Sequence, residues 1–350
     1  MKRLARLFAV FAVLSGLLVS QLGQLSAQSN ALVITPRKDY QLKPGESVSD
    51  QLTITNQDTE QPLQLALRVV DFTSQDETGT PQLLIEEGAS PTAWSLREFI
   101  EMPEQVTVNA GASVNVPIRI SVPEGTGAGS YYSAIEYSSV TDAEENRLNI
   151  SASSVTLMFV KVPGVAKQQL TFEQFGAFVP DSNGTGGSFA GLFFSSRPKV
   201  MAYRLTNDGN VAEQPNGSIV IRNFTGKEVY TIGDANPKDQ LALRGQTRRF
   251  EACIKPENVE QQGANNTQIN TVVCGDTNFA PGRYTAELSV LYGENGNETR
   301  EITAKASFWY LPWWFVGLMV AAIAIVVTIV VLIVRKVRDL GTRKTRKHRR

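Results

Sequence analysis

The chain has 350 residues, 42% hydrophobic and 19% charged, a composition that excludes a wholly disordered, collagen-like or coiled-coil protein. Its net charge is zero, but the charges are unevenly distributed. Nine of the 34 basic residues lie between Arg335 and Arg350, whereas residues 28–310 hold 22 basic and 33 acidic residues, a net charge of −11. The sequence therefore divides into an acidic central part, long enough for two domains, and two basic ends that each adjoin a hydrophobic run.

The first hydrophobic run is preceded by three basic residues. It extends from Leu7 to Val19 without a charge, and a short polar spacer leads to small residues that end at Ala27. This order is typical of a secretory signal peptide, residues 1–27. Because the run is short for a membrane span, we favour a cleaved peptide over an uncleaved anchor. We expect the mature protein to begin at Gln28.

The central part has a hydrophobic period of two. Residues 113–122 alternate between apolar and polar without interruption, which predicts a strand with one buried face, and Pro117 places this strand at an edge or a bulge. No helical period extends beyond a turn near Leu96. Short strands separated by Gly, Pro, Asn and Asp predict an all-β protein of antiparallel sandwiches. The other expected strands are 47–55, 63–70, 131–140, 151–162, 199–206, 217–222, 247–254, 284–292 and 300–308.

The two halves of the central part repeat one pattern. A strand ends at an asparagine, a glycine opens a later strand, and a second glycine precedes a tyrosine-containing strand. The glycines lie 18 residues apart in the first half and 37 in the second, and the difference nearly equals the 20 residues between Cys253 and Cys274. We interpret this as two similar domains, 31–165 and 166–308, the second with a loop insertion. The alternative is a chance repeat of ordinary β-sheet sequence. The matched residues are Asn56 with Asn207, Gly111 with Gly245, and Gly129 with Gly282.

The chain has two cysteines, Cys253 and Cys274, both in the part expected to be exported. An oxidising compartment favours a disulfide between them, which would close the base of the insertion. A metal site is the competing use, but two cysteines without histidines make a poor zinc site. We expect no metal and no cofactor.

Three aromatic residues are candidates for contact with a ligand: Trp94, Tyr131 and Tyr132. Neighbouring residues on a strand face opposite sides, so one tyrosine of the pair is expected outside if the other lies in the core. Trp94 fits a core position better than a binding platform.

The second hydrophobic run, residues 311–334, has no charge over 24 residues and is long enough to cross a bilayer as a helix. Its basic end predicts a tail, residues 335–350, on the cytoplasmic side and the domains outside. A buried core helix is the alternative, which the nine basic residues of the tail disfavour. The tail can attract anionic lipid, and we expect no nucleic acid to bind. Four aromatic residues are expected at the outer membrane interface and three basic residues at the inner one: Trp309, Tyr310, Trp313 and Trp314, then Arg335, Lys336 and Arg338.

The only histidine of the chain is His348, in the tail. No histidine-dependent hydrolase site can therefore form in the domains, and nucleotide-binding loops and calcium loops are also absent. Catalysis by a carboxylate pair stays open, since 33 acidic residues are available. We expect a binding protein and no enzyme.

Residues 42–47, Leu-Lys-Pro-Gly-Glu-Ser, lead into a strand that stops at Asn56, and Val122-Pro123 is followed by Gly129-Ser130-Tyr131. In these segments the chain resembles the immunoglobulin-like N-terminal region of bacterial WxL-interacting proteins. The overall plan is also similar: a signal peptide, two sandwich domains, one span and a short basic tail. The resemblance implies two immunoglobulin-like domains and an adhesion or scaffolding role in the cell envelope. It further implies that the first domain contacts peptidoglycan and the second binds surface proteins. The alternative is an accessory subunit of a membrane complex.

Overall fold

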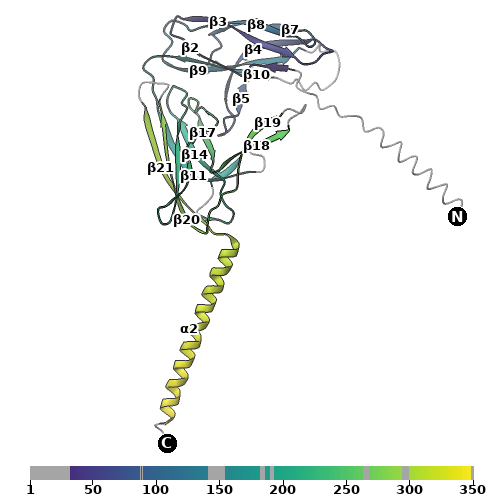
Figure 1. The fold of residues 1–350 in the computed structure, drawn as a ribbon. Coiled ribbons are helices and arrows are strands. Elements are labelled where there is room, and N and C mark those ends of the chain that lie inside the picture. Colours follow the sequence, from purple (N-terminus) through teal and green to yellow (C-terminus); the bar gives the residue numbers. More distant parts are fainter. Residues whose placement is uncertain are drawn as a thin grey trace, which may run out of the picture.

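The computed structural model describes residues 32–347 except 87, 89, 141–153, 182–185, 190–192, 263–267 and 294–298. The predicted signal peptide, residues 1–27, lies outside the described residues. Figure 1 shows two β-sandwiches and one long helix that leaves the second sandwich at the end away from the first. The predicted fold class, all-β with two tandem immunoglobulin-like sandwiches and one C-terminal helix, is confirmed.

The first sandwich, here called domain 1, contains strands β1 to β10. One sheet has the order β1-β3-β8-β6, and the other has the order β2-β10-β9-β4-β5, with β7 also paired to β4. The core lies between these sheets. The strands are β1 (Leu32–Ile34), β2 (Arg37–Gln41), β3 (Ser47–Asn56), β4 (Leu63–Ser74), β5 (Pro81–Leu84), β6 (Ile100–Glu101), β7 (Gln105–Val108), β8 (Ser113–Ser121), β9 (Gly129–Ser139) and β10 (Ser154–Val162).

Strand β8 forms because its apolar residues alternate with polar ones. Val116, Ile118 and Ile120 are buried, and the residues between them are more exposed. Pro117 faces Gln51 of β3, and on its other side β8 pairs with β6 only at Arg119 and Ile120. The proline therefore lies where β8 has no second neighbour, as the sequence predicted.

The second sandwich, domain 2, contains strands β11 to β21. Its sheets have the orders β12-β11-β14-β17 and β13-β21-β20-β15-β16, and β18 and β19 form a separate hairpin. The strands are β11 (Leu170–Pro180), β12 (Gly187–Phe189), β13 (Phe193–Phe194), β14 (Val200–Asn207), β15 (Asn216–Asn223), β16 (Glu228–Ile232), β17 (Thr247–Cys253), β18 (Pro256–Gln262), β19 (Gln268–Cys274), β20 (Gly282–Tyr292) and β21 (Arg300–Tyr310).

The hairpin β18–β19 lies between the two cysteines, in the segment that the glycine spacing predicts as a loop insertion. A disulfide joins Cys253, the last residue of β17, to Cys274, the last residue of β19. Pro256 pairs with Cys274 at the base of the hairpin. The bond therefore fixes both ends of the insertion to the edge of the domain 2 sheet.

The sequence repeat corresponds to one hydrogen-bond arrangement made twice. Asn56 donates through Nδ2 to the carbonyls of Gln61 and Val108 and accepts through Oδ1 from the Asp58 amide. Asn207 makes the equivalent bonds to Val211, Ala242 and Gly209. Each asparagine is almost fully buried and joins the end of one strand to two loops. The two domains therefore share a folding pattern beyond their sheet order.

Helix α2 (Trp313–Lys347) follows β21 after two residues. Residues Trp313–Lys336 are long and apolar enough to cross a membrane. The helix continues to Lys347, through most of the segment predicted as a tail. Lys and Arg are good helix formers, and their charges are favourable near a helix C-terminus, which accounts for the added length.

Candidate functional site at the junction of the two domains

An apolar cluster joins the outer face of the β9–β10 sheet of domain 1 to domain 2. Tyr132 of β9 is at its centre, with no exposed surface. Its ring centroid lies 5.1 Å from that of Phe72 and 5.6 Å from that of Trp94, on which it stacks. Ala212 and Leu243 of domain 2 complete the cluster. Burial of this face means that the two domains pack as a continuous structure rather than as independent units on a flexible linker.

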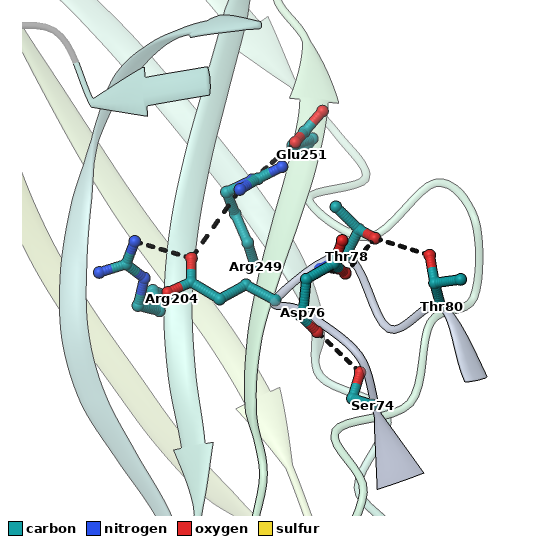
Figure 2. A network of polar contacts seen from close by, with 8 residues as sticks. Ser74, Asp76, Thr78, Thr80, Arg204, Arg249 and Glu251 are labelled. Carbon is teal, nitrogen blue, oxygen red and sulfur yellow. Dashed lines mark hydrogen bonds and ion pairs between the residues drawn. The ribbon is translucent and has the colours of Figure 1, made fainter. Parts of the chain in front are cut away.

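A polar clamp also joins the two domains (Figure 2). The turn between β4 and β5 reaches domain 2, where the Glu77 carboxylate lies 2.7 Å from Nη2 of Arg204 and 3.8 Å from Nη1 of Arg249. The Arg249 amide also donates to the Glu77 carbonyl at 2.7 Å. Arg249 pairs further with Glu251 at 2.7 Å and stacks 4.5 Å from the Phe178 ring centroid. One turn of domain 1 is thus held by side chains of β14 and β17 and by the backbone of β17.

The shape of this turn depends on Asp76 and Gly79. Asp76 accepts hydrogen bonds from the amide and the hydroxyl of Thr78. The Thr78 hydroxyl is the main reason that the pKa of Asp76 is lowered, and backbone bonds and the Arg249 charge add to the effect. Gly79 has a φ of 80°, and a Cβ there would lie 1.9 Å from Nη1 of Arg248. The position therefore favours glycine for its backbone conformation, and the end of the Arg248 side chain from domain 2 packs against it.

One backbone bond and two bonds between side chain and backbone make a third connection between the domains. The Ser130 amide donates to the Asn210 carbonyl at 2.9 Å, and Asn210 Nδ2 donates to the Ala128 carbonyl at 3.0 Å. The Ala212 amide donates to Ser130 Oγ at 2.9 Å. The sequence Asp208-Gly209-Asn210 is recognisable as a turn, but nothing in it indicated that Asn210 would connect two domains.

A cleft of about 380 Å³ opens next to these contacts, between β2 and β10 of domain 1 and the 212–241 region of domain 2. Its lining includes Arg37, Phe159, Lys161, Gln214 and Leu241. The Arg37 guanidinium lies 4.6 Å from the Phe159 ring centroid and 2.6 Å from the Asp39 carboxylate. The cleft thus combines two cations, one carboxylate and apolar surface.

The apolar surface extends along β10. Val155, Leu157 and Phe159 alternate with the buried core residues of that strand, and all three are half-buried on the outer face. The neighbouring Tyr132 is fully buried between domain 1 side chains and domain 2, but these three side chains stay partly accessible. Phe159 lines the cleft, and a row of apolar side chains that ends there is suited to contact with another protein.

Glu213 lies behind the cleft with 1% of its surface exposed. Its Oε2 accepts a hydrogen bond from the Gly293 amide at 2.9 Å, and its buried Oε1 has no hydrogen-bond partner among the described residues. Burial raises the pKa of Glu213, which the Gly293 amide, the Lys161 charge and Gln168 oppose. Glu213 is therefore a buried titratable group close to the cleft and to the segment between β10 and β11.

The structure places two of the predicted ligand-contacting aromatic residues, Trp94 and Tyr132, in the junction. Trp94 is half-buried and stacks on Tyr132. The expectation that one tyrosine of the pair faces solvent needs correction. Tyr131 packs against Phe99 and the domain 1 core, while Tyr132 faces outward from the sheet and is covered by domain 2. A sequence pattern gives the two faces of a strand but not which faces another domain covers.

Trp309, Trp313 and Trp314, predicted at the outer membrane interface, are exposed near the start of α2. Tyr310 is only 6% exposed, and its ring belongs to the domain 2 core. Its assignment to the membrane interface is therefore corrected, because β21 continues to Tyr310 and turns this side chain inward. Arg335, Lys336 and Arg338 lie on α2 at the far end of the apolar segment.

No family model and no curated protein matches the chain. Solved structures similar to it include a chaperone–tip adhesin complex of CFA/I fimbriae biogenesis, with 11% identity and a TM-score of 0.35 over 80% of this chain and 99% of that one. The E. coli chaperone DraB has 14% identity and a TM-score of 0.32, over 78% and 97% of the two chains. The CsuC–CsuE chaperone–tip adhesion subunit complex of Acinetobacter baumannii has 8% identity and a TM-score of 0.33, over 78% and 97%. At these identities the similarity concerns the fold alone.

Proposed function

We propose that the protein is a membrane-anchored binding protein of the cell surface that holds another protein in the cleft between its two domains. The observation that carries the proposal is the cleft itself. It lies between domains joined by an apolar cluster, a polar clamp and backbone bonds. A binding surface made by two firmly joined domains is pre-organised, which lowers the entropy lost when a partner binds.

The chemistry of the cleft favours a protein partner. Arg37, Asp39 and Lys161 supply charges of both signs, and Phe159 with its neighbours on β10 supplies apolar contact area. Sugar polymers are bound mainly by exposed aromatic faces, but here Tyr132 is buried and Trp94 is stacked on it. We therefore infer a surface protein as the partner and regard peptidoglycan as the partner to be tested second.

Catalysis is not part of the proposal. The only histidine, His348, lies in the C-terminal tail of the sequence. Among the residues that the structure describes, no group of three His, Cys, Asp or Glu side chains could hold a metal ion. The resemblance to WxL-interacting proteins supports the same role, a scaffold in a bacterial cell envelope with its domains outside the membrane.

The test exchanges the membrane anchor. Residues 311–334 are replaced by an unrelated hydrophobic helix, and partners are recovered from intact cells by chemical crosslinking. Partners retained by the exchanged protein support binding through the two domains. Partners lost with the span indicate instead an accessory subunit of a membrane complex, in which α2 makes the specific contact.

A pair of charge reversals locates the contact. Arg37→Glu changes an exposed cation of the cleft, and Arg119→Glu changes an exposed cation on β8, in the other sheet of domain 1. We expect only Arg37→Glu to reduce partner recovery. Sedimentation of residues 28–310 with purified peptidoglycan tests the second candidate, and co-sedimentation that Arg37→Glu leaves unchanged would favour wall binding outside the cleft.

A further inference from the structure

The junction between domain 2 and α2 is short and hydrogen-bonded. Only Leu311 and Pro312 separate β21 from the helix. The Leu311 amide donates to the Phe194 carbonyl at 2.8 Å, and the Pro312 carbonyl accepts from the amides of Phe315 and Val316 at 2.9 and 3.1 Å. Because the span begins directly at this junction, the adjacent end of domain 2 must lie at the surface of the membrane.

Large aromatic side chains are exposed at this same end. Phe193 of β13 is 64% exposed, and it pairs with Trp309, which is 39% exposed. Phe224, in the turn between β15 and β16, is 76% exposed. Its Cδ1 lies 3.8 Å from the position of a Cβ on Gly282, and Gly282 pairs with Tyr310 at the end of β21. All three aromatic side chains therefore lie close to the first turn of the helix.

The turn that carries Phe224 is held in shape by Asn223. Its Oδ1 accepts from the amides of Thr225 and Lys227 at 3.1 and 3.0 Å. Gly226 has a φ of 82°, which closes the turn. The phenyl group thus stands at the tip of an ordered turn. Exposed aromatic side chains that gather at one end of a domain, as Phe193, Phe224 and Trp309 do, are typical of a surface that contacts an apolar environment.

Cationic side chains accompany the aromatic ones. Lys227, in the same turn, and Arg283, which pairs with Trp309 across the sheet, are both exposed. Basic residues close to a bilayer are attracted by anionic headgroups, and aromatic rings favour the boundary between headgroups and acyl chains. Both properties fit the surface of the membrane that α2 crosses.

We propose that the end of domain 2 formed by Phe193, Phe224 and Trp309 is a lipid-contact surface that enters the outer face of the membrane spanned by α2. Phe224 and α2 then hold domain 2 at two separate points. The domain is fixed relative to the membrane plane, and the cleft at its opposite end is presented at a constant distance from the lipid. This inference does not depend on which partner the cleft binds.

The test measures depth in the membrane with a nitroxide spin label. Thr225→Cys places the label beside Phe224 in the full chain, whose native cysteines are joined to each other. Val165→Cys is the matched control. Val165 is 93% exposed and lies between β10 and β11, at the other end of domain 2. The protein is reconstituted in nanodiscs of phosphatidylcholine with phosphatidylglycerol, and the accessibility of each label to oxygen and to a water-soluble nickel chelate is measured.

We expect the label at position 225 to be more accessible to oxygen and less accessible to the chelate than the label at position 165. Adding Phe224→Ser to Thr225→Cys should shift the ratio toward the control. Equal accessibility at both positions would overturn the proposal. An unchanged ratio after Phe224→Ser would also overturn it, since the turn would then lie near the lipid without being anchored there. Phe224 is exposed, so its replacement leaves the core intact, which circular dichroism can verify.

Discussion

Replacement of Glu77 by alanine tests whether the two domains are held together as described. The Glu77 carboxylate lies 2.7 Å from Arg204 and 3.8 Å from Arg249, both on the other domain. Alanine removes the carboxylate and leaves both guanidinium groups facing domain 1. The backbone bond from the Arg249 amide to the Glu77 carbonyl can persist in the variant. The substitution therefore isolates the contribution of the side-chain clamp.

The expected magnitude follows from the exposure of the three groups. The side chains of Glu77 and Arg204 are 35% and 30% exposed, while that of Arg249 is 6% exposed and keeps Glu251 as a partner. Solvent-exposed ion pairs contribute about 0.2–1 kcal/mol, and removal of one member of a buried pair costs about 3–5 kcal/mol. The clamp lies between these cases, so we expect Glu77→Ala to lower the free energy of unfolding by about 1–2 kcal/mol.

The assay is urea unfolding of residues 28–310, followed by circular dichroism and by tryptophan fluorescence. Trp94 lies in the junction and reports its opening. Glu60→Ala, an exposed acid of domain 1 with no part in the junction, is the control. We expect a lower midpoint for Glu77→Ala alone, and a smaller difference at about 1 M salt, where the Debye length falls to about 3 Å. A midpoint equal to that of the wild type, or a loss that salt leaves unchanged, would refute the reasoning.

Three further predictions concern other parts of the structure. Asn207→Ala removes three buried hydrogen bonds and should lower the free energy of unfolding in urea by about 2–4 kcal/mol. A loss no larger than that of an exposed substitution would contradict the role of Asn207. Replacing Cys253 and Cys274 together by alanine opens a loop of sequence separation 21 and should lower stability by about 3 kcal/mol, to be compared with the reduced wild type. Glu213→Gln tests pH dependence: burial raises the folded pKa of Glu213, so its contribution to stability is lost as pH rises above the unfolded value of 4.5. The stability of the wild type relative to Glu213→Gln should therefore fall between pH 4.5 and neutral pH, and a constant difference would contradict this.

The long central strands could be predicted from the sequence because alternation of apolar and polar residues is a local property. Strand β8 shows this most clearly, since its buried face is the apolar one throughout. Strand β11 was not predicted, although it has 11 residues. A register shift between Phe172 and Gln174 interrupts its alternation, so the period of two is absent from the sequence. Strand β2 was missed because it is a polar edge strand, which pairs in parallel with β10.

The junction could be predicted only in part. The insertion was predicted from glycine spacing, and the disulfide from two cysteines in a part of the chain expected to be exported. The contact of Tyr132 with domain 2 depends on how the two sandwiches pack. Glu77 and Arg204 lie more than a hundred residues apart in the sequence, so no local pattern indicates that they form an ion pair. Acidic and basic residues of this kind are numerous in the central part of the chain, so their sequence positions do not indicate which pairs form.

The central claim, that the cleft holds another protein, is tested most directly by site-specific photocrosslinking in intact cells. Phe159→p-benzoylphenylalanine keeps an aromatic ring at the cleft. The same replacement at Phe172, which is 40% exposed on β11 and outside the cleft, is the control. The account predicts a discrete protein adduct from position 159 and none from position 172. Absence of an adduct from position 159, or equal adducts from both positions, would contradict it.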